Sequence, residues 1–527
     1  MDPALAKEVA TLAQHRVINE TIARGDSEIQ QFYSGATLFI TGGSGFLGKH
    51  LIEKLFRSCD IKKVYLLLRP KRKWTFPERL TFILKDPVFD LIKKTKPDFA
   101  NRIYPVEGDV AEPKLGLSDE EYKLIIEDTD VIIHVAATVS FDEPLKVAAL
   151  TNVRGTMEML RLAKKCNNLK SMVHVSTAYS NCTVDRINKE VEEQFYAPPL
   201  SPKIMVEMAE TMSEQRLNEI TPQLIKNWPN TYTFTKAIAE DAVRQMQAEI
   251  PICIVRPAIV ICSYREPSPG WLDISCAQGP SGLVIGCGLG VLHAIMVQPE
   301  IKTDLVPVDL VNNTVIAAGW KTAKQTDRQA NIYTVSSFRN HIYMKSIVNT
   351  MINEVLPKYA SPKAVWYSFT NQTTCRYYYL MLMWLWHYIP AYFIDLGLSI
   401  VGKRPSAVKL YTKAAKLMDV LFYFTTNEWK QCDRNLQALA AGMSPVDRTI
   451  YDLEISKIDW VEMMTIWAIG IRKYIVKDGL QGTQEGIDKQ KRYRIIHYLF
   501  SIVYFFILWK ILSWSFSLSS TALSYVF

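Results

Sequence analysis

At 527 residues the chain is longer than one typical domain, and its 48% hydrophobic composition can form a large core. This composition excludes a disordered or fibrous protein. The net charge of +8 comes from 61 basic and 53 acidic residues. A basic cluster (Lys489, Lys491, Arg492 and Arg494) directly precedes an apolar run, which favours a membrane flank over a nucleic-acid surface.

The beginning of the chain and its cysteines indicate a cytosolic setting. Residues 1–33 are polar and helix-prone, and they lack the uninterrupted apolar stretch of a signal peptide. Nine cysteines are scattered without a C-x-x-C pair, which favours reduced thiols over a disulfide framework or a zinc site. We therefore expect no metal.

The stretch 36–50 predicts a strand, a glycine-rich turn and a helix, in the order that a dinucleotide-binding fold requires. Gly42, Gly45 and Gly48 would allow a tight turn, close approach of the backbone to a pyrophosphate, and close packing of the helix on the strand. Such a loop alone is also compatible with another α/β protein.

Residues 63–69 predict a second buried strand that ends beside the adenosine ribose of such a fold. An acidic residue there would favour NAD, whereas this chain has Arg69 with Lys71, Arg72 and Lys73 close behind. Cations at this place favour a 2′-phosphate and hence NADPH. A solvated basic turn is the alternative.

Further strands are predicted at 103–110, 131–137 and 172–178, with helices at 78–99 and from Asn152 onward. Strands that alternate with helices over 36–180 predict a doubly wound parallel sheet, so the fold class is α/β. His134 and His174 lie within apolar strands, and we expect them to be core residues.

Tyr232 and Lys236 form a Y-x-x-x-K pair near the start of a predicted helix, one turn apart on one face. A nearby ammonium lowers a phenol pKa, so the tyrosine could donate a proton to a carbonyl oxygen as hydride arrives. Lys236 could also hold the nicotinamide ribose. The end of the fifth strand offers Ser176 and Thr177 as the second hydroxyl, and we favour Thr177.

These motifs, together with residues 152–156 and 254–257, resemble the extended short-chain dehydrogenases/reductases. More narrowly, residues 67–71, 134–141, 174–179 and 232–236 are similar to those of eukaryotic, insect-like, alcohol-forming fatty acyl-CoA reductases, over about 35–480. The resemblance implies NADPH-dependent reduction of a long-chain acyl-CoA to a primary alcohol, through an aldehyde and with release of CoA. Lys73-Trp74 departs from the family, where a glycine is usual. This departure concerns the shape of the loop on the adenosine side and not the chemistry.

The resemblance also implies the site. The catalytic residues would be Tyr232, Lys236, Thr177 and Ser176. The cofactor-binding residues would be Thr41, Gly42, Gly43, Ser44, Gly45, Phe46, Leu47, Gly48, Arg69, Asp109, Val110, Ala136, Ala137, Thr138, Asn152, Tyr232, Lys236 and Pro257.

The domains we expect are a helical lead (1–33), an NADPH-binding reductase domain (34–355), a helical C-terminal domain (360–480) and a membrane anchor (495–514). The reductase domain would contain an insertion at about 178–231, with a helix at 203–220. This insertion is either part of the acyl or CoA entrance or a surface excursion. The glycine-rich stretch 270–300 would form a flexible wall for the acyl chain.

Ile495 to Trp514 is the predicted transmembrane segment, with a peripheral hairpin as the alternative. The apolar run 377–401 contains His387, Pro390 and Asp395, and we expect an interfacial or buried helix there. The favoured location is the endoplasmic reticulum with a cytosolic catalytic domain, ahead of the peroxisome and the lipid droplet.

The expected partners are long-chain acyl-CoA and membrane lipid, with no nucleic acid and with a homodimer left open. Two other functions compete with acyl-CoA reduction. One is a membrane-bound hydroxysteroid dehydrogenase or other extended short-chain reductase, which the long C-terminal part argues against. The other is a catalytically silent NADPH-binding scaffold on a lipid surface, which the intact Tyr232 and Lys236 argue against.

Overall fold

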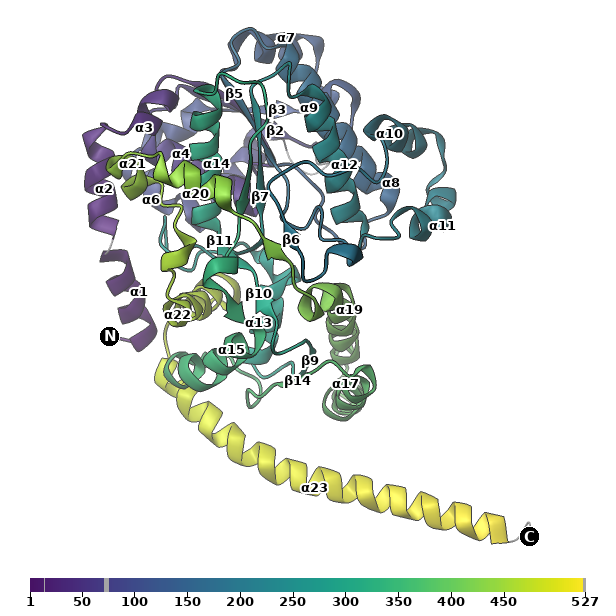
Figure 1. The fold of residues 1–527 in the computed structure, drawn as a ribbon. Coiled ribbons are helices and arrows are strands. Elements are labelled where there is room, and N and C mark those ends of the chain that lie inside the picture. The colour runs from purple at the N-terminus through teal and green to yellow at the C-terminus, as the bar shows by residue number, and fades with distance from the viewer. Residues whose placement is uncertain (14, 71–74, 525–527) are drawn as a thin grey trace.

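A seven-stranded parallel sheet lies at the centre of the protein (Figure 1). The structure, a computed structural model, describes residues 1–13, 15–70 and 75–524. The strand order β12-β7-β5-β4-β1-β2-β3 confirms the predicted doubly wound α/β class. The strands are β1 (Thr37–Thr41), β2 (Lys63–Leu68), β3 (Ile103–Glu107), β4 (Val131–His134), β5 (Ser171–Val175), β7 (Ile252–Pro257) and β12 (Ile332–Val335).

Helices cover both faces of the sheet, which explains why its strands are almost continuously apolar. In β1, Leu38 and Ile40 pack into the core on one face, while Phe39 packs on the other, as the two-residue period of a strand requires. One face is covered by α3 (Glu28–Tyr33), α4 (Phe46–Ser58) and α14 (Val308–Ala323), and the other by α7 (Asp119–Asp128), α9 (Gly155–Lys165) and α12 (Thr231–Met246).

The order of the strands reverses between β1 and β4, which are hydrogen-bonded neighbours although two strands separate them in the sequence. In open parallel sheets the ligand crevice lies beyond the carboxyl ends of the strands at such a reversal. The glycine loop after β1 and the ends of β4 and β5 meet at this edge.

Three predicted helices differ from the observed ones. The stretch 78–99 is broken where Pro87 and Pro97 each begin a new turn, because proline favours the first turn of a helix and disrupts its interior. The stretch 203–220 is two helices, and Ser213 caps the second. The helix expected from Asn152 begins earlier and contains a π-helical turn. These elements are α5 (Phe76–Leu84), η1 (Pro87–Phe89), α6 (Asp90–Thr95), η2 (Pro97–Arg102), α8 (Leu145–Ala148), η4 (Ala149–Arg154), α10 (Pro202–Thr211) and α11 (Glu214–Leu224).

Beyond β7 the chain builds a mainly helical region beneath the sheet in the view of Figure 1. Short two-stranded pairs, β8 with β11, β9 with β14 and β10 with β13, connect its helices. The elements of this region are β8 (Ile259–Ile261), α13 (Pro280–Gly288), β9 (Ala294–Met296), β10 (Lys302–Thr303), β11 (Leu305–Pro307), β13 (Ile342–Tyr343), α15 (Met344–Thr350), η8 (Met351–Val355), α16 (Leu356–Tyr359), β14 (Asn371–Thr373), α17 (Arg376–Met383), η9 (Trp384–Tyr388), α18 (Ile389–Ile400), α19 (Ala407–Thr426), α22 (Trp460–Gly470) and η11 (Ile471–Val476). Two further helices, α20 (Arg434–Ala441) and α21 (Pro445–Ile450), lie beside the sheet, where α20 packs on α14 and β12 (Figure 1).

The N-terminal helices α1 (Pro3–Ala13) and α2 (His15–Arg24) pack against the C-terminal helical region. Lys7 forms an ion pair with Glu462 at 3.0 Å, and the carboxylate of Asp2 accepts the backbone N–H of Thr483 at 2.9 Å. Ala4 is fully buried against Ile469. The N-terminal segment therefore packs against the C-terminal part of the chain.

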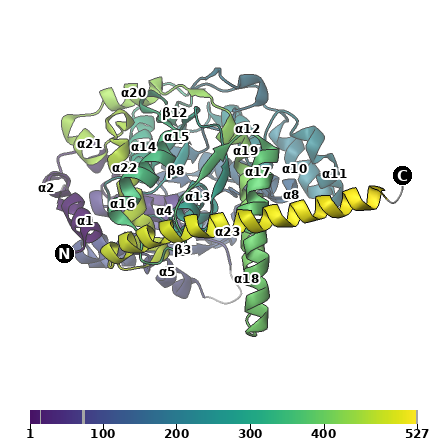
Figure 2. The same ribbon diagram turned by 90° about the horizontal axis from the view of Figure 1, so that it is seen from below.

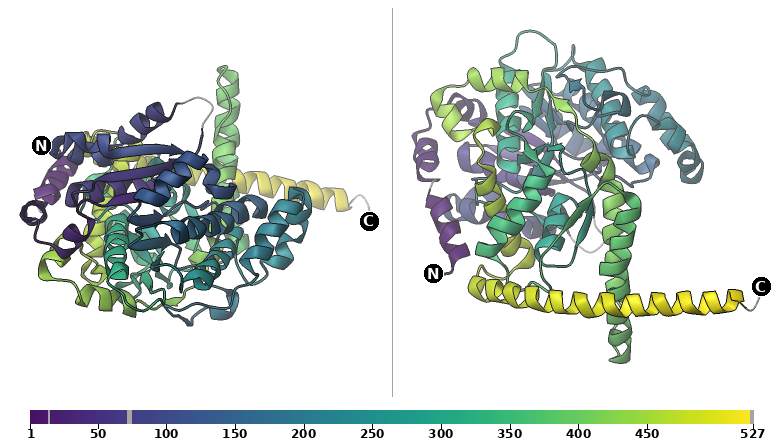
Figure 3. Two further views of the ribbon diagram at one scale, coloured as in Figure 1. Left: turned by 90° about the horizontal axis from the view of Figure 1, so that it is seen from above. Right: turned by 60° about the horizontal axis from the view of Figure 1, so that its bottom comes forward.

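The chain ends in a long helix, α23 (Thr483–Ser524), that runs beneath the body (Figures 1 and 2). Among the described residues it is the one helix long and apolar enough to cross a membrane, over Thr483–Ile511. It crosses the axis of α18, which projects from the body on the same side (Figures 2 and 3).

Candidate active site

The glycine loop leaves no room for side chains. Gly42 has a φ of +76°, and a Cβ there would lie 2.6 Å from the backbone nitrogen of Ala136. A Cβ on Gly48 would collide with the carbonyl of Gly42, and Gly45 donates its N–H to that same carbonyl at 3.0 Å. Because Gly45 is also the N-cap of α4, the loop opens onto free N–H groups of a helix N-terminus, an arrangement suited to phosphate oxygens.

Several of the other predicted loop residues hold the loop in place. Thr41 is buried, and its hydroxyl contacts Nδ1 of His134 at 2.7 Å and accepts the N–H of Ala136 at 3.3 Å. Phe46 stacks on Trp271 with ring centroids 5.2 Å apart, and Leu47 packs against the core. A Cβ on Gly43 would collide with the side chain of Leu66.

Two arginines lie close together beyond the end of β2. Arg69 is exposed, and Arg79 on α5 has its pKa lowered, first by burial and then by the charge of Arg69. Nη1 of Arg79 is buried without a hydrogen-bond partner. Arg79 was not predicted from the sequence. The predicted residues Lys71, Arg72, Lys73 and Trp74 lie outside the described residues.

At the next strand end, Oδ1 of Asp109 accepts the N–H of Ala111 at 3.0 Å, so this carboxylate shapes its own turn. Val110 is buried and packs beneath Gly155, where any side chain would crowd it. The Val110 side chain is thus part of the core.

Asn152 ties the loop after β4 to α12. Its Oδ1 accepts the N–H of Thr138 at 2.9 Å, and its Nδ2 donates to the carbonyl of Thr138 at 3.2 Å and to the Thr235 hydroxyl at 3.0 Å. Ala136 and Ala137 are half-buried in this loop. Asn152 therefore fixes the distance between the strand edge and the helix that carries Tyr232.

Helix α12 brings Tyr232 and Lys236 to the end of β5. Asn230 caps the helix by accepting the N–H of Thr233 at 2.9 Å, which fixes its start one residue before Tyr232. Lys236 Nζ donates to the carbonyl of Val175 at 2.8 Å, and Thr177 lies within hydrogen-bond reach of the Tyr232 hydroxyl.

The electrostatics differ from the sequence-based expectation. Burial raises the pKa of Tyr232 to about 12, partly offset by the hydrogen bond with Thr177, whereas the sequence predicted a lowering by Lys236. Burial lowers the pKa of Lys236 to about 8, and the charge of Glu240 opposes this shift. The reason is geometric: the ammonium is held on the carbonyl of Val175 rather than on the phenol.

Ser176 and Thr177 have different surroundings. The Ser176 hydroxyl donates to the buried carboxylate of Glu240 at 2.6 Å, while Thr177 is beside Tyr232. Glu240 also binds Arg256 through Nη2 at 2.7 Å and accepts the Ser180 hydroxyl at 2.9 Å. This network lies directly behind Lys236. Glu240 was not predicted, although it follows Lys236 by one helical turn.

The two strand histidines are buried, and burial lowers the pKa of both. His134 contacts the hydroxyls of Thr41 and Thr156 through its two ring nitrogens. Both ring nitrogens of His174 are buried without a partner, so it is a core residue whose polar atoms are unsatisfied.

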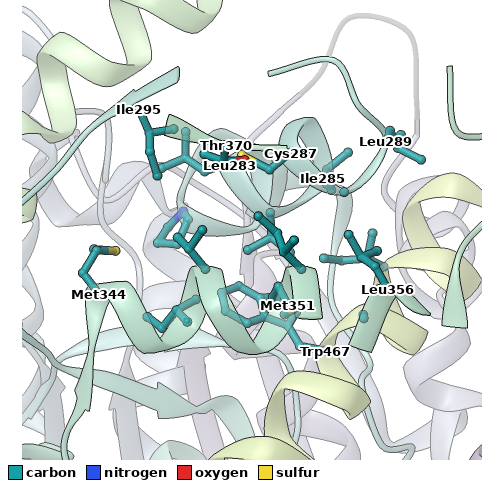
Figure 4. Close-up of a pocket in the computed structure, with 18 of the residues that line it drawn as sticks. Leu283, Ile285, Cys287, Leu289, Ile295, Met344, Met351, Leu356, Thr370 and Trp467 are labelled. Carbon is teal, nitrogen blue, oxygen red and sulfur yellow. The ribbon is translucent and has the colours of Figure 1, made fainter. Parts of the chain in front are cut away.

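An apolar cavity of about 140 Å³ lies in the helical region next to this edge (Figure 4). Its near end is formed by Ile259, two residues beyond Pro257, and by Phe424 of α19. Phe424 packs on Phe141 with ring centroids 5.3 Å apart, and Phe141 stacks on Tyr232 at 5.8 Å. Two aromatic rings, those of Phe141 and Phe424, therefore lie between the phenol and the cavity.

Helices from distant parts of the sequence form the rest of the cavity. Stretch 270–300, expected to be a flexible wall, contributes Leu283 and Leu289 from α13 and the turn after it. The described lining contains no residue of 178–231. Other lining residues include Ile347, Val348, Met351, Ile352, Leu356, Tyr359, Ser361, Thr370, Trp467, Ala468, Ile471, Arg472 and Val476.

The predicted insertion packs instead on the outer side of α12. Met205, Ala209 and Leu217 form a buried cluster with Phe234 and Ile238 of that helix. The insertion thus supports the helix that carries Tyr232.

Comparisons with known proteins identify the family and similar folds. A family model of NAD-binding domains described as "male sterility protein" matches residues 40–315, and a second model of the same description matches 386–478. The first match indicates a nicotinamide dinucleotide as the cofactor.

Similar proteins include the fatty acyl-CoA reductase wat of Drosophila melanogaster, 35% identical over 483 residues that cover 92% of both chains. Fatty acyl-CoA reductase 2 of Bos taurus is 34% identical over 493 residues that cover 92% of this chain and 93% of that one. Among solved structures, the terminal R domain of the myxalamid PKS-NRPS pathway has a TM-score of 0.56 at 20% identity, covering 87% of this chain and 98% of that one. The last likeness concerns the fold alone.

Proposed function

Because the chain belongs to the fatty acyl-CoA reductase family, we propose that it reduces long-chain acyl-CoA to a primary alcohol, with NADPH as reductant and release of CoA. The observation that carries the proposal is the meeting of Tyr232, Thr177 and Lys236 at a strand edge, separated from an apolar cavity by the rings of Phe141 and Phe424. The relatives are named fatty acyl-CoA reductases.

The loop after β1 fits a pyrophosphate, since Gly42 and Gly48 leave no room for side chains and the N-terminus of α4 lies open. The preference for NADPH over NADH rests on Arg69 and on Arg79, whose buried Nη1 lacks a partner. A 2′-phosphate would supply charge-assisted acceptors for this pair. Asp109, Ala136, Ala137, Thr138, Asn152 and Pro257 complete the proposed cofactor site.

When bound, NADPH would supply the hydride for each reduction, one molecule for the thioester carbon and a second molecule for the aldehyde carbon. Tyr232 and Thr177 donate hydrogen bonds to the oxygen on which negative charge develops. In the first round the resulting hemithioacetal loses CoA as the thiolate. In the second, Tyr232 gives its proton to the alkoxide, and its pKa of about 12 keeps the phenol protonated until then.

Lys236 holds the nicotinamide ribose in this proposal, and the carbonyl of Val175 positions its ammonium. We assign Ser176 to the structural network of Glu240 rather than to catalysis. The cavity would take the acyl chain, because its lining is almost wholly apolar.

We also propose that α23 anchors the protein in the endoplasmic reticulum membrane with the catalytic part in the cytosol. The basic cluster that precedes its apolar run supports this orientation. Protease treatment of intact vesicles that carry a C-terminally tagged protein tests it, and we expect the tag to be protected. Digestion of the tag would contradict the orientation.

The direct test of the activity is NADPH oxidation by the detergent-solubilised full chain with palmitoyl-CoA, with identification of the lipid product, beside Tyr232→Phe. We expect hexadecanol at two NADPH per thioester, and the variant should bind NADPH but lose turnover. Aldehyde as the sole product would limit the reaction to one hydride transfer. Bound NADPH without turnover on any acyl-CoA would overturn the proposal.

A further inference from the structure

The helix formed by α17, η9 and α18 carries apolar side chains on surfaces that no part of the described chain covers. In α17, Tyr379, Leu382 and Met383 face the body, where they pack with β9 and α19. Beyond Ala391 the helix projects from the body (Figure 2), and α19 packs along it. Phe393 is 70% exposed and Ile400 is 77% exposed.

This projecting hairpin is a defined structure rather than a loose end. The carboxylate of Asp395 accepts the backbone N–H groups of Ser406 and Ala407, both at 2.8 Å, and of Val408 at 3.0 Å. These bonds cap the start of α19 and close the hairpin. Asp395 is also the one acidic residue in 376–408, and its carboxylate is hydrogen-bonded within the hairpin.

The charged residues around the tip of the hairpin are basic. Lys403 and Arg404 are exposed at the tip, and Lys409 and Lys413 are exposed in the first half of α19, whereas the acidic residue of this helix, Asp419, lies in its second half. An apolar surface flanked by cations matches the interface of a bilayer that contains anionic lipid.

The hairpin is continuous with the candidate membrane helix. Tyr504 of α23 donates its hydroxyl to the carbonyl of Leu385 at 2.8 Å, and Trp386 packs against Phe505 with ring centroids 5.6 Å apart. Figures 2 and 3 show α18 and α23 crossing on the same side of the body. Hence, where α23 lies in lipid, the base of the hairpin lies beside that lipid.

We propose that the α18–α19 hairpin is a second membrane contact, embedded in the bilayer interface without crossing it, with Lys403 and Arg404 at the lipid phosphates. One side of α17 packs on the protein, which fits a helix lying in the interface better than a span. This proposal is independent of the reaction that the protein catalyses.

The placement has a consequence for substrate access. Helix α19 connects the hairpin to the active-site loop, where Lys416 pairs with Asp142 at 2.6 Å and Phe424 packs on Phe141. From Ala407 to Phe424 the helix rises by about 25 Å. The hairpin thereby holds the near end of the cavity at a fixed height above the lipid surface.

The test uses the full chain in nanodiscs of phosphatidylcholine with phosphatidylserine. Cys375, the exposed cysteine, is replaced by serine, and a single environment-sensitive fluorophore is attached at Phe393→Cys or Ile400→Cys. The matched control is Val184→Cys, which is 55% exposed on the sheet-bearing part of the molecule. Each labelled protein is first checked for the unfolding temperature of the unlabelled protein, which reports an intact fold.

Lipid carrying a nitroxide at acyl carbon 5 should quench the fluorophore at 393 and 400 at least twofold and leave the control unchanged. Equal, weak quenching at all three positions would overturn the proposal. Blue-shifted emission at position 393 without quenching by the lipid nitroxide, in discs that hold two copies of the protein, would show that this site lies against protein. That result would overturn the membrane contact in favour of a protein partner.

Discussion

The strand edge and the apolar cavity lie side by side but are built in opposite ways. At the edge, polar side chains from a few short motifs are held by specific bonds, as when Lys236 donates to Val175 and Asn152 bridges Thr138 to Thr235. In the cavity, apolar residues from many separated segments surround a space with almost no polar atoms. The edge therefore has the properties needed for bond making, and the cavity those needed for selecting substrates by size.

This difference predicts how mutations should act. A change at the edge should affect all substrates alike and by large factors, because it removes stabilisation of the transition state. A change in the cavity should be smaller and should depend on chain length, because an apolar pocket discriminates weakly for each methylene.

The largest effect should come from the two neighbouring hydroxyls. Thr177→Val should lower kcat about 10²–10³-fold, as expected for loss of one oxyanion donor, whereas Ser176→Ala should leave kcat within a small factor. Steady-state kinetics with palmitoyl-CoA measures both. Ser176→Ala should instead lower the free energy of unfolding by about 1–3 kcal/mol, because the buried carboxylate of Glu240 loses a donor. A larger loss of kcat in Ser176→Ala than in Thr177→Val would show that Ser176, not Thr177, is the catalytic hydroxyl.

The next effect concerns the choice of cofactor. Arg79→Ala should raise the KM for NADPH about 10–100-fold, equivalent to loss of one charge-assisted bond of about 1.5–3 kcal/mol, and leave the KM for NADH unchanged. Initial rates with the two cofactors measure this. Lys85→Ala, which removes a cation just beyond α5, is the matched control. Equal changes for both cofactors would show that Arg79 does not contact a 2′-phosphate.

A smaller effect is expected at the far end of the cavity. Leu356→Trp should lower kcat/KM about tenfold for an eighteen-carbon acyl-CoA but little for a twelve-carbon one, because the larger ring shortens the cavity. Competition between the two substrates measures the ratio directly. Val365→Trp places the same ring on the surface nearby and should leave the ratio unchanged. An equal loss for both chain lengths would place the acyl chain elsewhere.

The same contrast explains what the sequence could predict. Gly42, Thr177, Tyr232 and Lys236 belong to short motifs whose chemistry depends on local spacing, and the order of elements brings them to one edge. The cavity depends on which distant helices touch, and nothing local in Leu283, Met351 or Trp467 specifies that they meet.

The misjudged pKa of Tyr232 has the same origin. The i, i+4 spacing placed a cation near the phenol, but burial and the carbonyl of Val175 depend on β5, which is far away in the sequence. The break at Pro87, by contrast, is a local effect that the sequence did contain.

The smallest effect is a pH dependence that belongs to the edge alone. Burial lowers the pKa of Lys236 to about 8, so its ammonium is complete at pH 6.5 and is lost as the pH rises through 8. The phenol of Tyr232, with a pKa of about 12, stays protonated throughout this range. At saturating NADPH, kcat/KM for palmitoyl-CoA should therefore be about twofold lower at pH 8 than at pH 6.5 and continue to fall above pH 8.

The residual activity of Lys236→Arg should show no such decline, because a guanidinium does not titrate in this pH range. Leu356→Trp should keep the wild-type profile, since the cavity has no part in this titration. A wild-type profile that stays level to pH 9.5 would mean that the charge of Lys236 is not needed for turnover.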